Sequence, residues 1–243
     1  MYLSRIVLDA RSRSARSLLA DCHALHRVIM SGFPAVDSEA ARAALGVLYR
    51  VEQMSEPPTI PVLVQSKVEP RWMPETDAIS GIEVPKPLDG LLERVRAGSR
   101  YRFRLRANPT RRVHGRATLE PDAESARQRA EKTGSKGKRV ELTREADQVV
   151  WLERQAEAAG FAIVTSRLLP ADRDISALLA AGASKMDGRR NGHKMTFGTV
   201  LFDGLLEVRD ADRFREALVS GIGPGKAFGC GLLSIAPVQG PAN

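Results

Sequence analysis

Arginine alternates strictly with apolar residues from Arg100 to Arg106, and this pattern constrains the fold more than any other segment. Because successive side chains of a β-strand point to opposite faces, a strand with one apolar and one basic face is predicted. The apolar face, expected in a core, is Tyr101, Phe103 and Leu105, and the basic face is Arg102, Arg104 and Arg106. Residues 94–116 hold nine arginines and no carboxylate, which favours binding of a polyanion. The alternative is an arginine-coated edge strand that prevents aggregation.

Hydrophobic periodicity predicts two consecutive units with a similar order of elements. The first has strands at 2–8, 44–53, 60–66 and 81–85 and a helix at 19–30. The second has strands at 100–106, 161–168, 195–208 and 231–236 and helices at 143–159 and 210–220, the earlier helix capped by Thr143. We therefore predict an α+β protein with two tandem ferredoxin-like (βαββαβ) domains, at residues 1–92 and 97–239. Residues 11–16, 107–139 and 185–194 are interpreted as loops.

The basic charge is unevenly distributed along the chain. Residues 1–92 hold 10 Lys and Arg against 11 Asp and Glu, whereas residues 93–243 hold 27 against 18. Two further basic clusters lie in the second part: Lys132, Lys136, Lys138 and Arg139, and Lys185, Arg189, Arg190 and Lys194. This asymmetry predicts nucleic acid as the partner. No apolar run is long enough to span a membrane, and two cysteines form no disulfide framework, so a cytoplasmic location is expected.

A glycine-rich segment runs from Gly221 to Gly231 and holds five glycines in eleven residues. It matches neither the dinucleotide-binding fingerprint nor the P-loop. The backbone amides around Gly223 and Gly225, beside Lys226, are predicted to bind phosphate oxygens. The alternative is a long turn between a helix and the last strand.

Two of the four histidines, His23 and His26, are three residues apart on one predicted helix and so share a face. Histidine is suited to proton transfer near neutral pH. A zinc site needs at least three ligands, and no cluster of cysteines or carboxylates accompanies this pair, so no metal is expected. The sequence also lacks a Gly-x-Ser-x-Gly elbow and clustered carboxylates. A nuclease of this composition would therefore use the 2′-hydroxyl of RNA as its nucleophile.

Five segments carry a resemblance to a known family: residues 1–8, the pair His26-Arg27, residues 103–109 (Phe-Arg-Leu-Arg-Ala-Asn-Pro), residues 150–154 (Val-Trp-Leu-Glu-Arg) and residues 221–237. Together they resemble the CasE family, CRISPR RNA-processing endoribonucleases of the type I-E Cascade complex. The resemblance implies metal-independent cleavage at the base of the CRISPR repeat stem-loop, without a cofactor. It also implies that the enzyme stays on its product RNA and joins the other Cascade subunits.

The resemblance also assigns roles to individual residues. His26 matches the catalytic histidine of the family. Where some members carry an assisting tyrosine, this chain has His23, whose role stays open. Residues 223–229 match the glycine-rich loop of the family, and the cluster at 185–194 matches its RNA-groove hairpin. The competing hypothesis is a non-catalytic RNA-binding subunit of a ribonucleoprotein complex. Binding to an anionic membrane is set aside, because the helix at 143–159 is too acidic to present a basic face.

Overall fold

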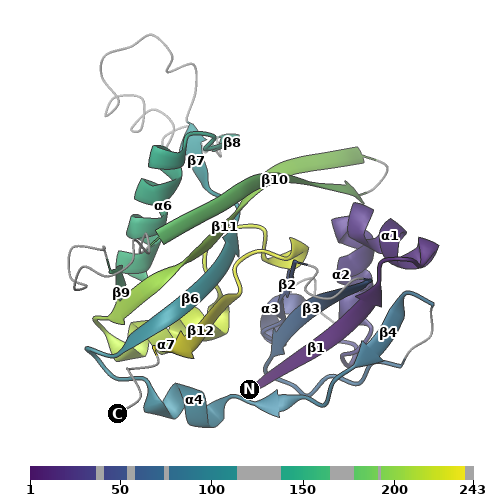
Figure 1. Cartoon of the computed structure of the whole chain (residues 1–243), viewed down its shortest axis with the longest axis horizontal. Coiled ribbons are helices and arrows are strands. Elements are labelled where there is room, and N and C mark those ends of the chain that lie inside the picture. The colour runs from purple at the N-terminus through teal and green to yellow at the C-terminus, as the bar shows by residue number, and fades with distance from the viewer. Residues whose placement is uncertain are drawn as a thin grey trace.

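A computed structural model describes residues 1–36, 41–53, 58–73, 77–113, 138–164, 178–190 and 193–238. Its elements form two antiparallel sheets that face each other (Figure 1). A separate two-stranded ribbon consists of β7 (Thr110–Val113) and β8 (Lys138–Glu141). Among the described residues, no helix is long and apolar enough to cross a membrane.

The first sheet is built from the N-terminal part of the chain. Its strands are β1 (Tyr2–Asp9), β2 (Leu48–Val51), β3 (Thr59–Ser66) and β4 (Ile79–Ile82), in the order β2-β3-β1-β4, and β5 (Lys86–Pro87) also pairs with β1. Helices α1 (Arg13–Ala20) and α2 (Cys22–Met30) supply Ala15, Leu25 and Ile29 to a core with Ile6, Leu8, Val62 and Val64. A short helix, α3 (Ala41–Ala44), precedes β2.

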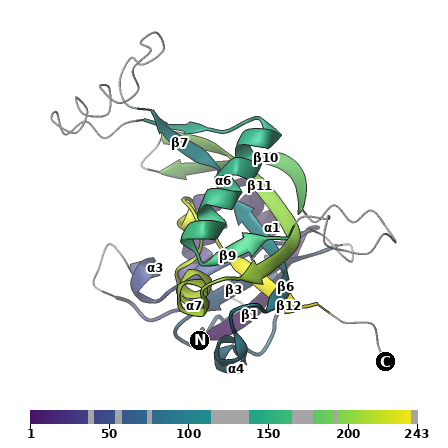
Figure 2. The same ribbon diagram turned by 90° about the vertical axis from the view of Figure 1, so that its left-hand side faces the viewer.

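The second sheet has the order β10-β11-β6-β12. Its strands are β6 (Arg100–Ala107), β10 (Leu178–Arg190), β11 (His193–Val208) and β12 (Leu233–Pro237), with β9 (Phe161–Ile163) also paired to β11. Helices α6 (Glu145–Ala158) and α7 (Ala211–Ser220) cover the face that points away from the first sheet (Figure 2). They bury the apolar face of β6, Tyr101, Phe103 and Leu105, as the alternation predicted.

Both sheets follow the strand order of a ferredoxin-like unit, and the predicted α+β class with two such units is confirmed. The chain passes between the two cores through α4 (Asp89–Arg94), since Ile82 packs on the first core and Leu92 on the second. Leu92 lies inside the first predicted domain but packs on the second core, and the division into domains at residues 1–92 and 97–239 stays a proposal.

Three local predictions were wrong. The helix predicted at 19–30 is two helices, because the Asp21 carboxylate accepts hydrogen bonds from the amides of His23 and Ala24 and so starts a new helix. The first of these helices already begins at Arg13, inside the predicted loop at 11–16. The N-cap of α6 is Arg144, without a side-chain cap, and not Thr143.

The segment predicted as a loop at 185–194 belongs instead to the β10–β11 hairpin, whose strands pair from Leu178–Gly204 to Arg190–His193. Strand β10 was not predicted. Within the predicted loop at 107–139, β7 and β8 occupy the ends, and residues 114–137 lie outside the described part.

A buried arginine joins the two sheets. The side chain of Arg50, on β2, is 2% exposed and pairs with Glu52. Its Nη1 donates to the carbonyls of Arg104 on β6 and of Leu232, each at 3.0 Å, and its Nη2 donates to Ser234 Oγ on β12 at 3.0 Å. Strand β2 is therefore fixed against the second half of the chain.

Candidate active site between the two halves

Helix α2 carries both candidate catalytic histidines. His23 lies in its first turn, where the Asp21 cap fixes the helix start, and His26 follows three residues later on the same face. His26 is half-buried, and its Nδ1 atom is shielded from solvent without a hydrogen-bond partner in the described part of the chain. A donor or acceptor left unpaired in this way is uncommon and costly. Only the other ring nitrogen, Nε2, is therefore available to a substrate.

Two aromatic rings hold the imidazole of His26. The ring of Tyr49 lies nearly parallel to it, with centroids 6.4 Å apart, and the ring of Phe228 meets it edge-on at 6.5 Å. Burial lowers the pKa of His26 below its usual 6.5, and the nearby charges of His23 and Arg42 lower it further. The imidazole is therefore neutral at pH 7 in the free protein, which suits it to accept a proton.

The glycine-rich segment lies directly against this histidine helix. Its short 3-10 helix η2 (Lys226–Phe228) follows Gly225, which has a φ of 79°. The hydroxyl of Tyr49 donates to the carbonyl of Ala227 at 3.1 Å, so the loop is tied to β2 and to the His26 environment. Folding thus brings together a histidine and a loop that are about 200 residues apart in the sequence.

The glycines and the lysine of this loop have structural partners. Gly223 lies with a φ of 74° against Trp151, whose ring would be 2.9 Å from an added Cβ. The ammonium of Lys226 donates to the carbonyl of Ser220 at 2.8 Å. Burial, and then the charge of Arg42, lower the pKa of Lys226. Phosphate binding by Gly223, Gly225 and Lys226 stays a prediction. Of these three residues, Lys226 supplies a positive charge beside the candidate site.

Three residues beside the candidate histidines were not predicted from the sequence: Tyr49, Phe228 and Arg42. Arg42 is partly buried on α3 and donates to the carbonyl of Val47 at 2.8 Å, and its charge acts on both His26 and Lys226. Its isolated position in the sequence gave no signal. Tyr49 was predicted only as a residue of the strand at 44–53.

The three arginines of β6 differ in their surroundings. Arg102 is exposed, and the described residues give it no hydrogen bond or ion pair. Arg104 pairs with Asp203 at 2.7 Å and with Glu52 of the first half at 3.3 Å. Arg106 is half-buried and donates to the carbonyl of Val51 at 3.3 Å. The basic face predicted for RNA therefore also meets the first half of the molecule.

The other basic candidates are only partly described. Arg139 on β8 and Lys185 on β10 are exposed. For Lys138, Arg189, Arg190 and Lys194 the backbone places each on its strand, and Arg189 faces Lys194 across the hairpin. Lys132 and Lys136 lie outside the described residues. RNA contacts of these residues stay predictions.

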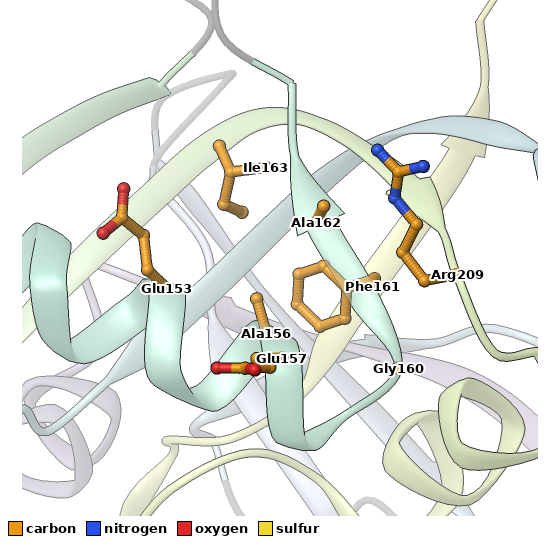
Figure 3. Close-up of a pocket in the computed structure, with 8 residues that line it drawn as sticks. All are labelled: Glu153, Ala156, Glu157, Gly160, Phe161, Ala162, Ile163 and Arg209. Carbon is orange, nitrogen blue, oxygen red and sulfur yellow. The ribbon is translucent and has the colours of Figure 1, made fainter.

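The described residues contain no group of three or more histidine, cysteine or carboxylate side chains that could hold a metal ion. Cys22 and Cys230 are both buried and free. A cavity of about 320 Å³ lies elsewhere, between the end of α6 and β9, where Glu153 and Glu157 line it opposite Arg209 (Figure 3). None of the candidate residues lines it.

Comparison with known proteins gives consistent matches along the whole chain. Residues 1–237 match the family described as CRISPR associated protein. The CRISPR-associated endoribonuclease Cse3 of Thermus thermophilus is 35% identical over 239 residues, which cover 98% of this chain and 100% of that protein. The CRISPR system Cascade subunit CasE of Escherichia coli is 30% identical over 238 residues, with 98% and 100% covered. The solved structure of endoribonuclease Cse3 bound to a 19-nucleotide RNA superposes with a TM-score of 0.75 at 32% identity, covering 98% of this chain and 100% of that one.

Proposed function

Because this chain belongs to the family of CRISPR-associated proteins that includes Cse3 and CasE, we propose that it is the endoribonuclease that processes CRISPR repeat RNA. The enzyme cleaves precursor RNA at the base of the repeat stem-loop and stays with its product as a Cascade subunit. The single observation that carries this assignment is the position of His26, which lies against the glycine-rich loop with one ring nitrogen left for substrate. As predicted from the sequence, we place the protein in the cytoplasm.

The reaction needs no group beyond the RNA and the protein. The 2′-oxygen attacks the adjacent phosphorus, the bond to the 5′-oxygen breaks, and the products carry a 2′,3′-cyclic phosphate and a 5′-hydroxyl. The neutral His26 accepts the 2′-hydroxyl proton at Nε2, because its pKa lies below the usual value in the free protein. His23, on the same helix face, returns a proton to the departing 5′-oxygen. Lys226 and Arg42 lie where they can offset the charge of the phosphorane.

A cleavage assay on a synthetic repeat stem-loop tests the function. We expect His26→Ala to lower the single-turnover rate by about 100-fold or more while a native gel still shows RNA binding. His114→Ala, at a histidine with no assigned role, is the matched control. A 2′-deoxy sugar at the cut site should bind and resist cleavage, and cleavage should persist in EDTA. Binding by the wild-type protein without cleavage would favour the non-catalytic RNA-binding subunit instead.

The two proton transfers are separated by a modified substrate. Sulfur in place of the 5′-bridging oxygen leaves without a proton, so it removes the need for an acid. The modified RNA should rescue His23→Ala and should not rescue His26→Ala. The opposite result would exchange the two roles.

A further inference from the structure

The β10–β11 hairpin extends beyond the second sheet toward the histidine helix. Strand β6 pairs with β11 only from Val200 onward, whereas β10 and β11 continue to pair from Ala183 to Arg190. This outer part reaches across to α1 and α2 of the first half (Figure 1). A segment of the second domain thus contacts the helix that carries His23 and His26.

Gly188 is one of the residues at this contact. It is buried, and a Cβ added there would lie 2.6 Å from Cys22 Sγ, 3.4 Å from Asp21 Oδ1 and 3.5 Å from the amide nitrogen of His23. These three atoms belong to the cap and first turn of α2. A separation of 2.6 Å is closer than any real Cβ contact, so the strand approaches this closely only because residue 188 has no side chain.

The two faces of β10 look in different directions near this contact. Gly188 faces helix α2 of the first half, and Met186, two residues earlier on the same face of the strand, reaches the glycine-rich loop, where its Cε lies 3.8 Å from a Cβ built on Gly229. Lys185 and Asp187 alternate with them and are exposed. The same strand therefore contacts both parts of the candidate active site with one face and presents a cation to solvent with the other.

We propose that Gly188 is a positioning residue that seats the hairpin on the first turn of α2, so that RNA held by the hairpin is fixed relative to His26. This rests on the function proposed above. Two paired strands are stiff, and the Asp21 cap fixes the start of the helix, so a displacement at the contact moves the substrate relative to the histidine. In-line attack requires the reacting atoms to be held within a fraction of an ångström, and a shift of about 1 Å can cost about 100-fold in rate.

Steric complementation tests the proposal. In Gly188→Ala, the new methyl group meets the sulfur of Cys22, and we expect the single-turnover cleavage rate at saturating enzyme to fall by about tenfold or more. Affinity for the repeat stem-loop should stay within about twofold, since the hairpin keeps its cations. Cys22→Ala alone should cleave at nearly the wild-type rate. The double variant should recover most of the lost rate, because the methyl group then occupies the space of the sulfur.

The controls separate seating from folding and from RNA binding. Lys185→Ala, on the exposed face, should weaken binding of the repeat stem-loop, whereas Gly188→Ala should not. Equal melting temperatures for Gly188→Ala and the wild type would show that the fold is intact. A Gly188→Ala protein that cleaves at the wild-type rate, or a double variant as slow as the single one, would overturn the proposal.

A cross-link tests the contact without reference to cleavage. In Gly188→Cys, the new thiol and Cys22 should form a disulfide when oxidised glutathione accepts their two electrons and two protons. Burial raises the pKa of Cys22 to about 11, so the reaction is run at mildly alkaline pH and followed by peptide mapping. Lys185→Cys, whose side chain points away, should not cross-link. Absence of the Gly188→Cys link would overturn the seating, whereas a link in a protein that never cleaves RNA would refute only the proposed function.

Discussion

The imidazole of His26 and the phenol ring of Tyr49 lie almost parallel, 6.4 Å apart between centroids and 20° between planes. The phenol is fully buried, and its hydroxyl lies 3.1 Å from the carbonyl of Ala227 and 3.4 Å from that of Cys22. Burial raises the pKa of Tyr49 well above its usual 10, so the hydroxyl keeps its proton across the working pH range. One residue of β2 therefore contacts the histidine helix, the histidine ring and the glycine-rich loop.

Removal of this hydroxyl should loosen the loop beside His26. Tyr49→Phe keeps the ring against the imidazole but leaves the Ala227 carbonyl without its donor. We expect a loss of about 1 kcal/mol in the free energy of unfolding and a several-fold slower cleavage with unchanged RNA affinity. Urea unfolding and single-turnover kinetics measure both. Tyr2→Phe is the matched control, since its hydroxyl has no partner among the described residues. Equal effects of the two substitutions would contradict the role of Tyr49.

The lowered pKa of His26 predicts a direction for the pH dependence of stability. The unfolded chain binds the proton near the usual pKa of 6.5, whereas the folded protein binds it only at lower pH. The stabilising contribution is therefore complete above pH 6.5 and is lost as the pH falls toward the folded-state pKa. The unfolding free energy of the wild type should drop relative to that of His26→Gln in this window. An NMR titration of the free protein should place the His26 pKa below 6.5; a value above 6.5 would contradict the burial argument.

Local patterns in the sequence predicted much of the fold. The alternation of residues 100–106 identified β6 and both of its faces, because the two-residue period of a strand needs no distant partner. Strand β10 was missed since its segment, rich in alanine and glycine, has little strand propensity and is held by pairing with β11. The break at Asp21 follows from capping chemistry, which was visible in the sequence and was not used.

The candidate site could be predicted only in part for a related reason. The spacing of His23 and His26 is local, and so is the glycine content of the loop. Their contact depends on Tyr49, which meets a carbonyl 178 residues away in the sequence. In the same way, alternation placed Arg104 on a face but could not show that Glu52 of the other half lies opposite it.

Arg50 should be among the most important residues for the arrangement of the two halves. Its guanidinium is buried with Glu52 and serves two carbonyls and one hydroxyl of the second half. Arg50→Met leaves Oε1 of Glu52 and these acceptors without their donor, although Arg104 still pairs with Oε2 of Glu52. We expect a loss of about 3–5 kcal/mol in unfolding free energy. Arg5→Met, which breaks the exposed pair with Glu83, should cost less than about 1 kcal/mol. If urea unfolding gave similar losses for Arg50→Met and Arg5→Met, the buried hydrogen bonds of Arg50 would not be what holds the two halves together.

The arginines of β6 should separate into one that binds RNA and one that joins the halves. Arg102 is exposed without an ion pair among the described residues, so it is free to contact a phosphate. For Arg102→Ala we expect weaker binding of the repeat stem-loop, a slope of log affinity against log salt that is shallower by about 0.7–0.9, and an unchanged melting temperature. Arg104→Ala breaks the pairs with Glu52 and Asp203, both partly exposed, so it should lower stability by about 1 kcal/mol or less and leave the salt slope nearly unchanged. Binding measured at several salt concentrations decides between the two roles. An arginine that stays paired with two carboxylates in the complex releases no counterion from the RNA. A shallower salt slope for Arg104→Ala would therefore mean that the ion pairs of Arg104 with Glu52 and Asp203 open when RNA binds.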